Sequence, residues 1–121
     1  MTLATTNSTS EQRNAGSASE YVSKGWEQKS SGKLDDAEAN FRKAILLEPG
    51  SVEAYYGLAL IYKIQDRRQE SIKSFEKVID LIDDHFEDKV RGQMLQRLSK
   101  GHINQMSGGD WNLEKEIWKR E

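Results

Sequence analysis

Cysteine is missing from this chain of 121 residues, proline occurs once, and there is no long apolar run. The lack of cysteine excludes disulfide bonds and thiolate metal sites, and it leaves the redox compartment unconstrained. The most apolar stretch, residues 55–64, is interrupted by Lys63 and is much shorter than the roughly 20 apolar residues of a membrane helix. The sequence therefore predicts a protein without disulfides and without membrane insertion.

An excess of positive charge is also lacking, since 18 lysines and arginines face 20 aspartates and glutamates, for a formal net charge of −2. Non-specific nucleic-acid binding depends on a basic surface that displaces counterions from the phosphates. A helix–turn–helix reader of DNA would in addition need a basic recognition helix, which the sequence does not contain. We therefore expect no nucleic-acid partner.

The first 16 residues are rich in serine, threonine and asparagine and contain no apolar block. A secretory signal needs a basic start and 7–15 consecutive apolar residues, so we expect residues 1–16 to be a disordered leader and the protein to be cytoplasmic. Ser17 and Glu20 have the spacing of a helix capping box, which predicts that the helical domain spans residues 17–121.

Catalytic and metal-binding chemistry finds little support in the sequence. The two histidines, His85 and His102, lack further ligands at the spacing of a metal site. The acidic stretch 83–88 lacks the glycine and the twelve-residue ligand spacing of a calcium loop. Residues 107–110 are not a phosphate loop, because no Lys-Ser or Lys-Thr follows them. We expect them to end one helix and to cap the next. We expect no enzyme, no cofactor and no metal.

An internal repeat is the strongest positive signal. The segment AEANFRKAILLEPG, which begins at Ala37, matches SIKSFEKVIDLIDD, which begins at Ser71, so that Phe41 aligns with Phe75 at a spacing of 34 residues. This spacing is the period of a helix–turn–helix solenoid. Apolar residues at helical spacing and the turn residues between them then divide the chain. The expected helices span residues 19–30, 34–47, 52–65, 69–82 and 86–106, with a short last helix that begins at Asp110.

The repeat resembles the tetratricopeptide family, whose pattern is Trp-x2-Leu-Gly-x2-Tyr, then Ala-x3-Phe, then proline. The matching residues are Tyr21, Gly25, Ala37, Phe41 and Pro49 in the first unit and Tyr55, Leu58, Ala59, Tyr62, Ser71 and Phe75 in the second. The first unit departs from the pattern at Lys24 and Gln28, and the second has Asp83 in place of the proline.

The resemblance implies an all-α fold, an antiparallel helix-pair solenoid of two repeats followed by a degenerate C-terminal capping pair. The repeats would span about residues 18–50 and 51–84, and the third pair about 86–121. Small residues at Gly25 and Ala59 would let the helices of each unit approach closely, and Phe41 and Phe75 would fill the wedges between helix pairs.

Such solenoids usually receive a peptide or a partner helix in a concave groove, so the resemblance implies a non-enzymatic adaptor with a protein or peptide partner. The positions that the repeat frame carries over to this groove are Val22, Trp26, Lys29, Glu53, Tyr56, Leu60, Lys63, Met94 and Arg97. Trp26 and Tyr56 could instead cover the packed face. The carboxylate clamp that some family members use for chaperone tails is disfavoured, because Val22, Trp26 and Gly57 stand where lysine and asparagine would be needed.

An alternative is a structural subunit that oligomerises or docks through its end faces. Trp111, Ile117 and Trp118 would form an apolar edge near the C-terminus. This edge could close the last helix pair, or it could contact another protomer and make a homo-oligomer.

Overall fold

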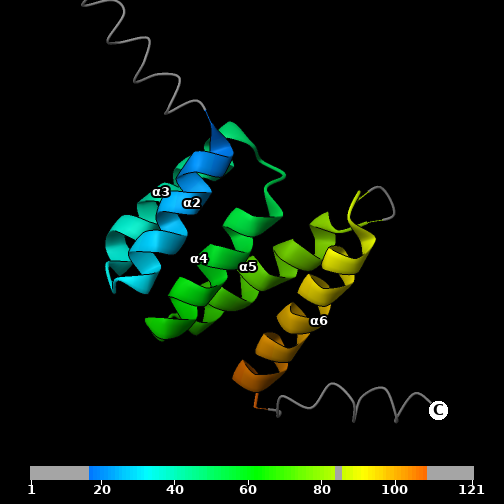
Figure 1. Cartoon of the computed structure of the whole chain (residues 1–121). Helices are drawn as coiled ribbons and strands as arrows, with labels where there is room; N and C mark the ends of the chain where they lie inside the picture. The colour runs from blue at the N-terminus through cyan, green and yellow to red at the C-terminus, as the bar shows by residue number, and fades with distance from the viewer. Residues whose placement is uncertain (1–16, 84–85, 109–121) are drawn as a thin grey trace, which may run out of the picture.

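The fold was analysed in a computed structural model that describes residues 17–83 and 86–108. Figure 1 shows helix pairs following one another in chain order across the molecule. The helices of the described part are α2 (Ala18–Ser30), α3 (Leu34–Leu47), α4 (Val52–Ile64), α5 (Arg68–Leu81) and α6 (Lys89–Met106). The expected leader 1–16 and the expected last helix from Asp110 lie outside the described residues.

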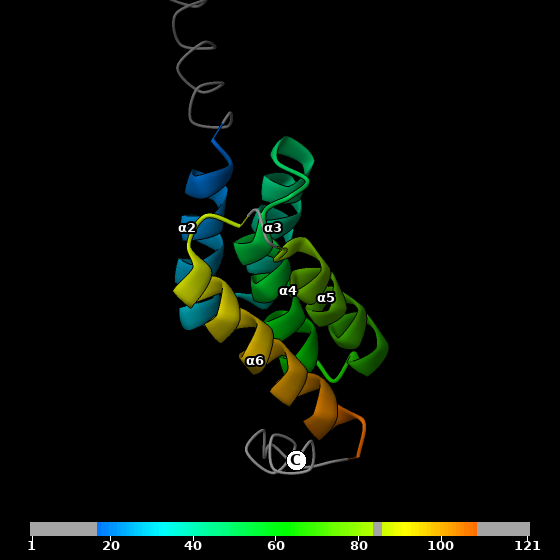
Figure 2. The same ribbon diagram turned by 90° about the vertical axis from the view of Figure 1, so that its right-hand side faces the viewer.

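The helices pack as two antiparallel pairs and one further helix. The helix α2 packs along α3, and α4 packs along α5. The two pairs meet through α3 and α4 and through α2 and α4, while α6 packs on α5. Figure 2, seen from the α6 side, shows α6 lying across the second pair. This arrangement is the all-α helix-pair solenoid that the 34-residue repeat predicts.

The helix boundaries follow from local capping. Ser17 Oγ accepts a hydrogen bond from the Glu20 amide at 3.3 Å, and Ser51 Oγ accepts one from the Ala54 amide at 3.3 Å. Helix α6 begins at Lys89 and not at residue 86, because the Asp88 carboxylate caps it by accepting from the Arg91 amide at 3.0 Å. Side-chain caps of this kind satisfy amides that no helical carbonyl can reach.

The turns within the two pairs repeat as well. Gly32 has a φ of 80° between α2 and α3, and Asp66, 34 positions later, has a φ of 62° between α4 and α5. Glycine adopts this left-handed conformation without steric cost, and aspartate is one of the few other residues that tolerate it. The pair Asp66–Arg67 thus takes the place that Gly32–Lys33 holds in the first unit.

Phe41 joins the first pair to the second. Its side chain is fully buried, and its ring lies against Gly25 of α2 and Gly57 of α4. A Cβ atom at either glycine would come within 3.0 Å of the ring. Protein interiors are densely packed, so the Phe41 ring fits here only because Gly25 and Gly57 lack side chains. The role of Gly25 was predicted from the repeat frame, whereas the role of Gly57 was not.

Phe75 occupies the next wedge. It is fully buried in a cluster with Ala59 of α4 and Met106 of α6. The His102 ring of α6 stacks on the Phe75 ring at a centroid distance of 4.6 Å and an interplanar angle of 8°. The second aromatic of the repeat therefore anchors α6 to the second pair, as Phe41 anchors the second pair to the first.

Two buried serines contribute differently to these contacts. The Ser71 hydroxyl of α5 donates a 2.7 Å hydrogen bond to the Ala59 carbonyl of α4, which satisfies the hydroxyl inside the core. The Ser99 hydroxyl of α6 is also fully buried, and it has no hydrogen-bond partner among residues 17–83 and 86–108. An unsatisfied buried hydroxyl costs stability. Ser99 thus fits α6 by its small size and not by its polarity.

A cluster of polar side chains around Glu38 also connects the two pairs. The Glu38 carboxylate of α3 accepts hydrogen bonds from Arg42 Nε at 3.1 Å, from the Tyr62 hydroxyl at 3.2 Å and from Arg67 Nη1 at 3.3 Å. Burial and then the Glu38 charge raise the pKa of Tyr62, partly offset by the neighbouring arginines. The cluster connects α3, α4 and the start of α5, so the two pairs are fixed by polar contacts in addition to Phe41.

Replacing Gly57 by alanine tests the contact with Phe41. Alanine is the better helix former by about 1 kcal/mol. The added methyl group must displace an enclosed aromatic ring, and overpacking of this kind costs about 1–3 kcal/mol. Because a Cβ at Gly57 would overlap three atoms of the Phe41 ring, we expect a cost in the upper part of this range, about 2–3 kcal/mol. After the gain in helix propensity, Gly57→Ala should lower the free energy of unfolding by about 1–2 kcal/mol in urea titrations at an unchanged m-value. The matched control is Gly50→Ala, since a Cβ at Gly50 meets no atom within 4 Å. A Gly57→Ala variant as stable as the wild type would refute the tight fit.

Candidate functional site

Two aromatic side chains lie between the core and the surface on the first helices of the pairs. Trp26 of α2 and Tyr56 of α4 are both partly buried, and their ring centroids are 6.5 Å apart. The Trp26 ring packs edge-on against Phe41 at 5.2 Å, and the Tyr56 ring packs edge-on against Phe75 at 5.7 Å. Each ring therefore rests on the repeat phenylalanine of its own pair and keeps part of its surface accessible.

An open cleft lies at the N-terminal end of these helices. It is lined from three sides, by Ala18 and Val22 of α2, by Val52 and Glu53 of α4, and by Phe86 and Arg91 beside and on α6. The Glu53 carboxylate forms an ion pair with the Arg91 guanidinium, which connects α4 to α6 across the cleft. Both partners are partly exposed, so the pair contributes positioning more than stability.

A polar cluster lies at the C-terminal end of α4. Lys63 Nζ donates to His102 Nδ1 at 2.8 Å and to Gln105 Oε1 at 2.6 Å. Because the ammonium group can only donate, Nδ1 is the unprotonated nitrogen of this imidazole. Nε2 then carries the proton and lies 3.5 Å from the Tyr56 hydroxyl. The cluster connects α4 to the last turns of α6 and ends beside one of the two aromatic side chains.

Burial, and then the charge of Lys63, lower the pKa of His102 from its ordinary value of 6.5 to about 4. Burial also lowers the pKa of Lys63 and raises that of Tyr56. At neutral pH the imidazole is therefore uncharged, and Lys63 supplies the positive charge of this end.

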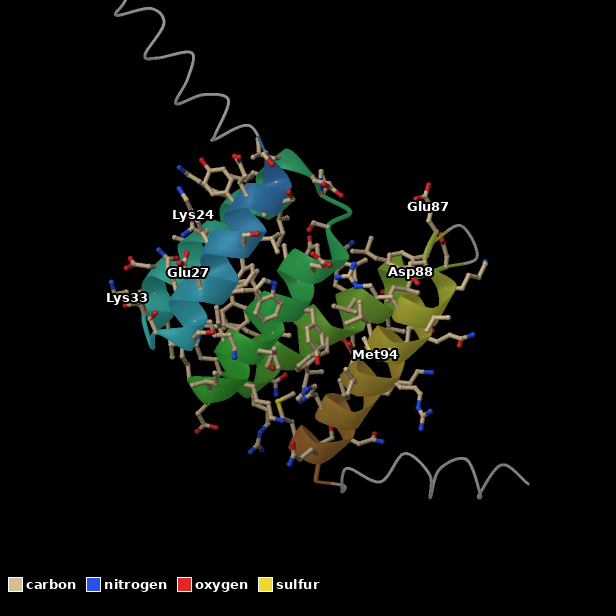
Figure 3. The ribbon with its side chains drawn as sticks, viewed as in Figure 1. Lys24, Glu27, Lys33, Glu87, Asp88 and Met94 are labelled. Atoms are coloured by element: carbon tan, nitrogen blue, oxygen red, sulfur yellow. The ribbon has the colours of Figure 1, made fainter. Side chains whose placement is uncertain are left out.

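The structure brings most of the predicted groove positions to one side of the molecule. Lys29 and Leu60 are partly buried beside Trp26 and Tyr56, and Met94 on α6 (labelled in Figure 3) is 52% exposed. Glu53 and Lys63 lie at the two ends, each bonded to α6. We call the surface of Trp26, Lys29, Glu53, Tyr56, Leu60, Lys63 and Met94 the concave groove, after the groove that the repeat frame predicts.

Two predicted positions need correction. Val22 is only 6% exposed and belongs to the core cluster around Phe41, because α2 packs against α4 there. Arg97 lies two residues from the buried Leu95 and from the buried Ser99, so it projects from the opposite side of α6. Arg97 is therefore not placed to contact a partner in the groove, and Val22 reaches only the cleft at its N-terminal end.

The sequence reasoning missed His102, Gln105 and Arg91. His102 was judged only as a metal ligand, and Gln105 and Arg91 carry no signal without the position of α6. The repeat frame fades after Asp83, so no spacing argument could have placed these residues against α4. A partial signal exists in the pattern of α6, where the buried Leu95 and Ser99 fix which side faces the second pair.

Residues 17–83 and 86–108 hold no group of three or more histidines, aspartates or glutamates that could bind a metal ion. In the same residues no helix has the length and apolar character needed to cross a bilayer.

The described helices define a helix-pair repeat protein. The sequence model of the tetratricopeptide repeat matches residues 21–51 and again 52–85, which together make up more than half of the chain. The chain therefore belongs to the tetratricopeptide repeat family. Neither the comparison with curated proteins nor that with solved structures finds a match. Repeats of this family generally mediate protein–protein interactions and are typically non-enzymatic.

The lowered pKa of His102 predicts how stability depends on pH. The unfolded chain binds a proton at this histidine below about pH 6.5, whereas the folded protein does so only near pH 4. The contribution of His102 to stability is therefore full above pH 6.5 and is lost as the pH falls toward 4. We expect a proton NMR titration of the imidazole to show a midpoint near 4, with the resonance assigned by its loss in His102→Gln. Between pH 7 and pH 5 the wild type should lose more stability than this variant. A midpoint at 6 or above would contradict the burial of the ring.

Proposed function

We propose that this protein is a non-enzymatic adaptor that binds a peptide or helical segment of a partner protein in the concave groove. The observation that carries the proposal is the pair of Trp26 and Tyr56, whose rings are held by Phe41 and Phe75 and remain partly accessible. Tryptophan and tyrosine are the residues that most often dominate binding energy at interfaces, and rigid placement lowers the entropic cost of binding.

The charges of the groove favour a partner with acidic residues. Lys29 and Lys63 lie in the last turns of α2 and α4, and Glu53 is neutralised by its ion pair with Arg91. Lysines at helix C-termini also interact favourably with the helix dipole, so they stabilise the fold whether or not a partner is bound. The proposal includes a cytoplasmic location and no cofactor, on the strength of the sequence and the family.

Peptide selection tests the proposal without knowledge of the natural partner. Random 12-residue peptides displayed on phage are selected on the wild-type protein, and their affinities are measured by fluorescence anisotropy. We expect Tyr56→Ala to weaken binding by about 30-fold, the effect of losing a hot spot worth about 2 kcal/mol. The matched control Gln93→Ala changes an exposed side chain on the other side of α6 and should leave binding unchanged.

Circular dichroism of Tyr56→Ala checks that the variant keeps its helical content. Lys29→Glu provides a second test by charge reversal at the rim. Selected peptides that bind the wild type and both groove variants equally would refute the groove as the binding site.

A second candidate function is assembly through an end face. The specific observation is that Val90 and Met94, one helical turn apart on α6, are 78% and 52% exposed. Exposed apolar side chains of this kind can contact another protomer. The predicted edge of Trp111, Ile117 and Trp118 lies outside the described residues. If this candidate is right, sedimentation velocity should detect a dimer that dissociates in Val90→Asp and persists in Gln93→Asp. A protein that stays monomeric at all concentrations excludes it.

A further inference from the structure

The exposed surface of α6 has two parallel stripes of different chemistry. One stripe is polar and consists of Lys89, Gln93, Arg97, Lys100 and Asn104. The neighbouring stripe, displaced by one residue, consists of the exposed Val90 and Met94 and the partly buried Leu98. Residues at these spacings lie along one side of a helix, so each set forms a continuous line.

The polar stripe faces the side on which a paired helix would lie. Gln96, next to this stripe, donates hydrogen bonds to the Ile79 carbonyl at 3.3 Å and to the Ile82 carbonyl at 2.9 Å, which places the stripe on the α5 side of α6. In the complete pair α4–α5, α4 instead packs on α5 with the buried apolar residues Val52 and Ala59. A helix packed on the polar stripe would have to bury charged side chains such as Lys100, which is unfavourable.

The apolar stripe lies on the α4 side of α6 and continues the concave groove. Arg91 and His102, which flank this stripe, contact Glu53 and Tyr56 of α4. The stripe therefore adds Met94 and Leu98 to the accessible surfaces of Trp26, Tyr56 and Leu60. Apolar side chains that form one surface in this way normally have an occupant.

The chain itself supplies a candidate occupant just after α6. Met106 is buried against Ala59 and Phe75, and Gln105 is bonded to Lys63, so α6 ends at the C-terminal end of the groove. Gly108, with a φ of 96°, then allows a sharp change of direction. The segment 109–121 has 13 residues, the same number as α4. A helix of this length is about 20 Å long.

The composition of this segment suits the groove. Trp111, Leu113, Ile117 and Trp118 supply large apolar side chains. The four carboxylates of the segment outnumber its three basic side chains, and Asp110, Glu114 and Glu116 can pair with the lysines of the groove. We propose that residues 109–121 bind in the concave groove of their own chain, along the apolar stripe of α6, and compete there with the partner. This inference rests on the proposed function of the groove. It replaces the expectation that the segment forms a capping helix pair with α6, which would place the segment on the polar stripe.

Cysteine crosslinking tests the inference cleanly, because the chain contains no cysteine of its own. Lys119→Cys is combined either with Met94→Cys on the apolar stripe or with Gln93→Cys on the polar stripe. These two positions are adjacent in sequence and both exposed, so only the side of α6 differs. Under mild oxidation at low protein concentration, we expect the Met94→Cys pair to form an intramolecular disulfide at least tenfold faster than the Gln93→Cys pair.

Equal rates, or faster crosslinking of the Gln93→Cys pair, would overturn the inference, because the segment would then have no preference for the groove or would pair with the outer side. Disulfide-linked dimers whose rate of formation rises with concentration would also overturn it and assign the groove to a second copy. The measurement needs no partner, so its outcome is independent of whether selected peptides bind the groove.

Discussion

The structure depends on one steric constraint, the enclosure of the Phe41 ring between Gly25 and Gly57. The ring is fully buried, and neither glycine position leaves space for a methyl group. Because the two glycines belong to helices of different pairs, the ring sets the distance between the pairs as well as the distance within the first. The surface above it is thereby fixed, since Trp26 rests on Phe41 and Tyr56 lies beside Trp26.

The groove that results has an aromatic middle and polar ends. At one end the ion pair of Glu53 and Arg91 connects α4 to α6, and at the other end Lys63 connects α4 to His102 and Gln105. The stacked rings of Phe75 and His102 already hold α6 in place. The polar contacts at the two ends therefore restrict little additional motion of the helices. The surface is therefore largely preformed, and under the proposed function this lowers the entropic cost of binding a partner.

The two helix pairs could be predicted from the sequence because each carries its own signals. The spacing of Phe41 and Phe75 indicates the period, and the left-handed positions Gly32 and Asp66 recur in step with it. The groove positions on α2 and α4 were predicted from the same frame. The Val22 side chain, however, is buried where α2 packs against α4.

The position of α6 could not be predicted, because the frame fades after Asp83 and Asp88 delays the start of the helix. Its contacts depend on tertiary packing that leaves no periodic trace in the sequence. Arg97 was therefore assigned to the wrong side of α6, and His102 was considered only as a metal ligand, although it contacts Phe75, Tyr56 and Lys63.

Because the buried Phe41 ring packs on both helix pairs, we expect the two pairs to open as one cooperative unit. Repeat proteins can open locally at their ends, since each repeat contacts only its neighbours. Native-state hydrogen exchange measures the opening free energy of individual amides. The account predicts that the amides around Gly25 in α2 and those around Gly57 in α4 open with the same free energy. An α2–α3 pair that opens at a free energy lower by more than about 1–2 kcal/mol, while α4 stays closed, would contradict it.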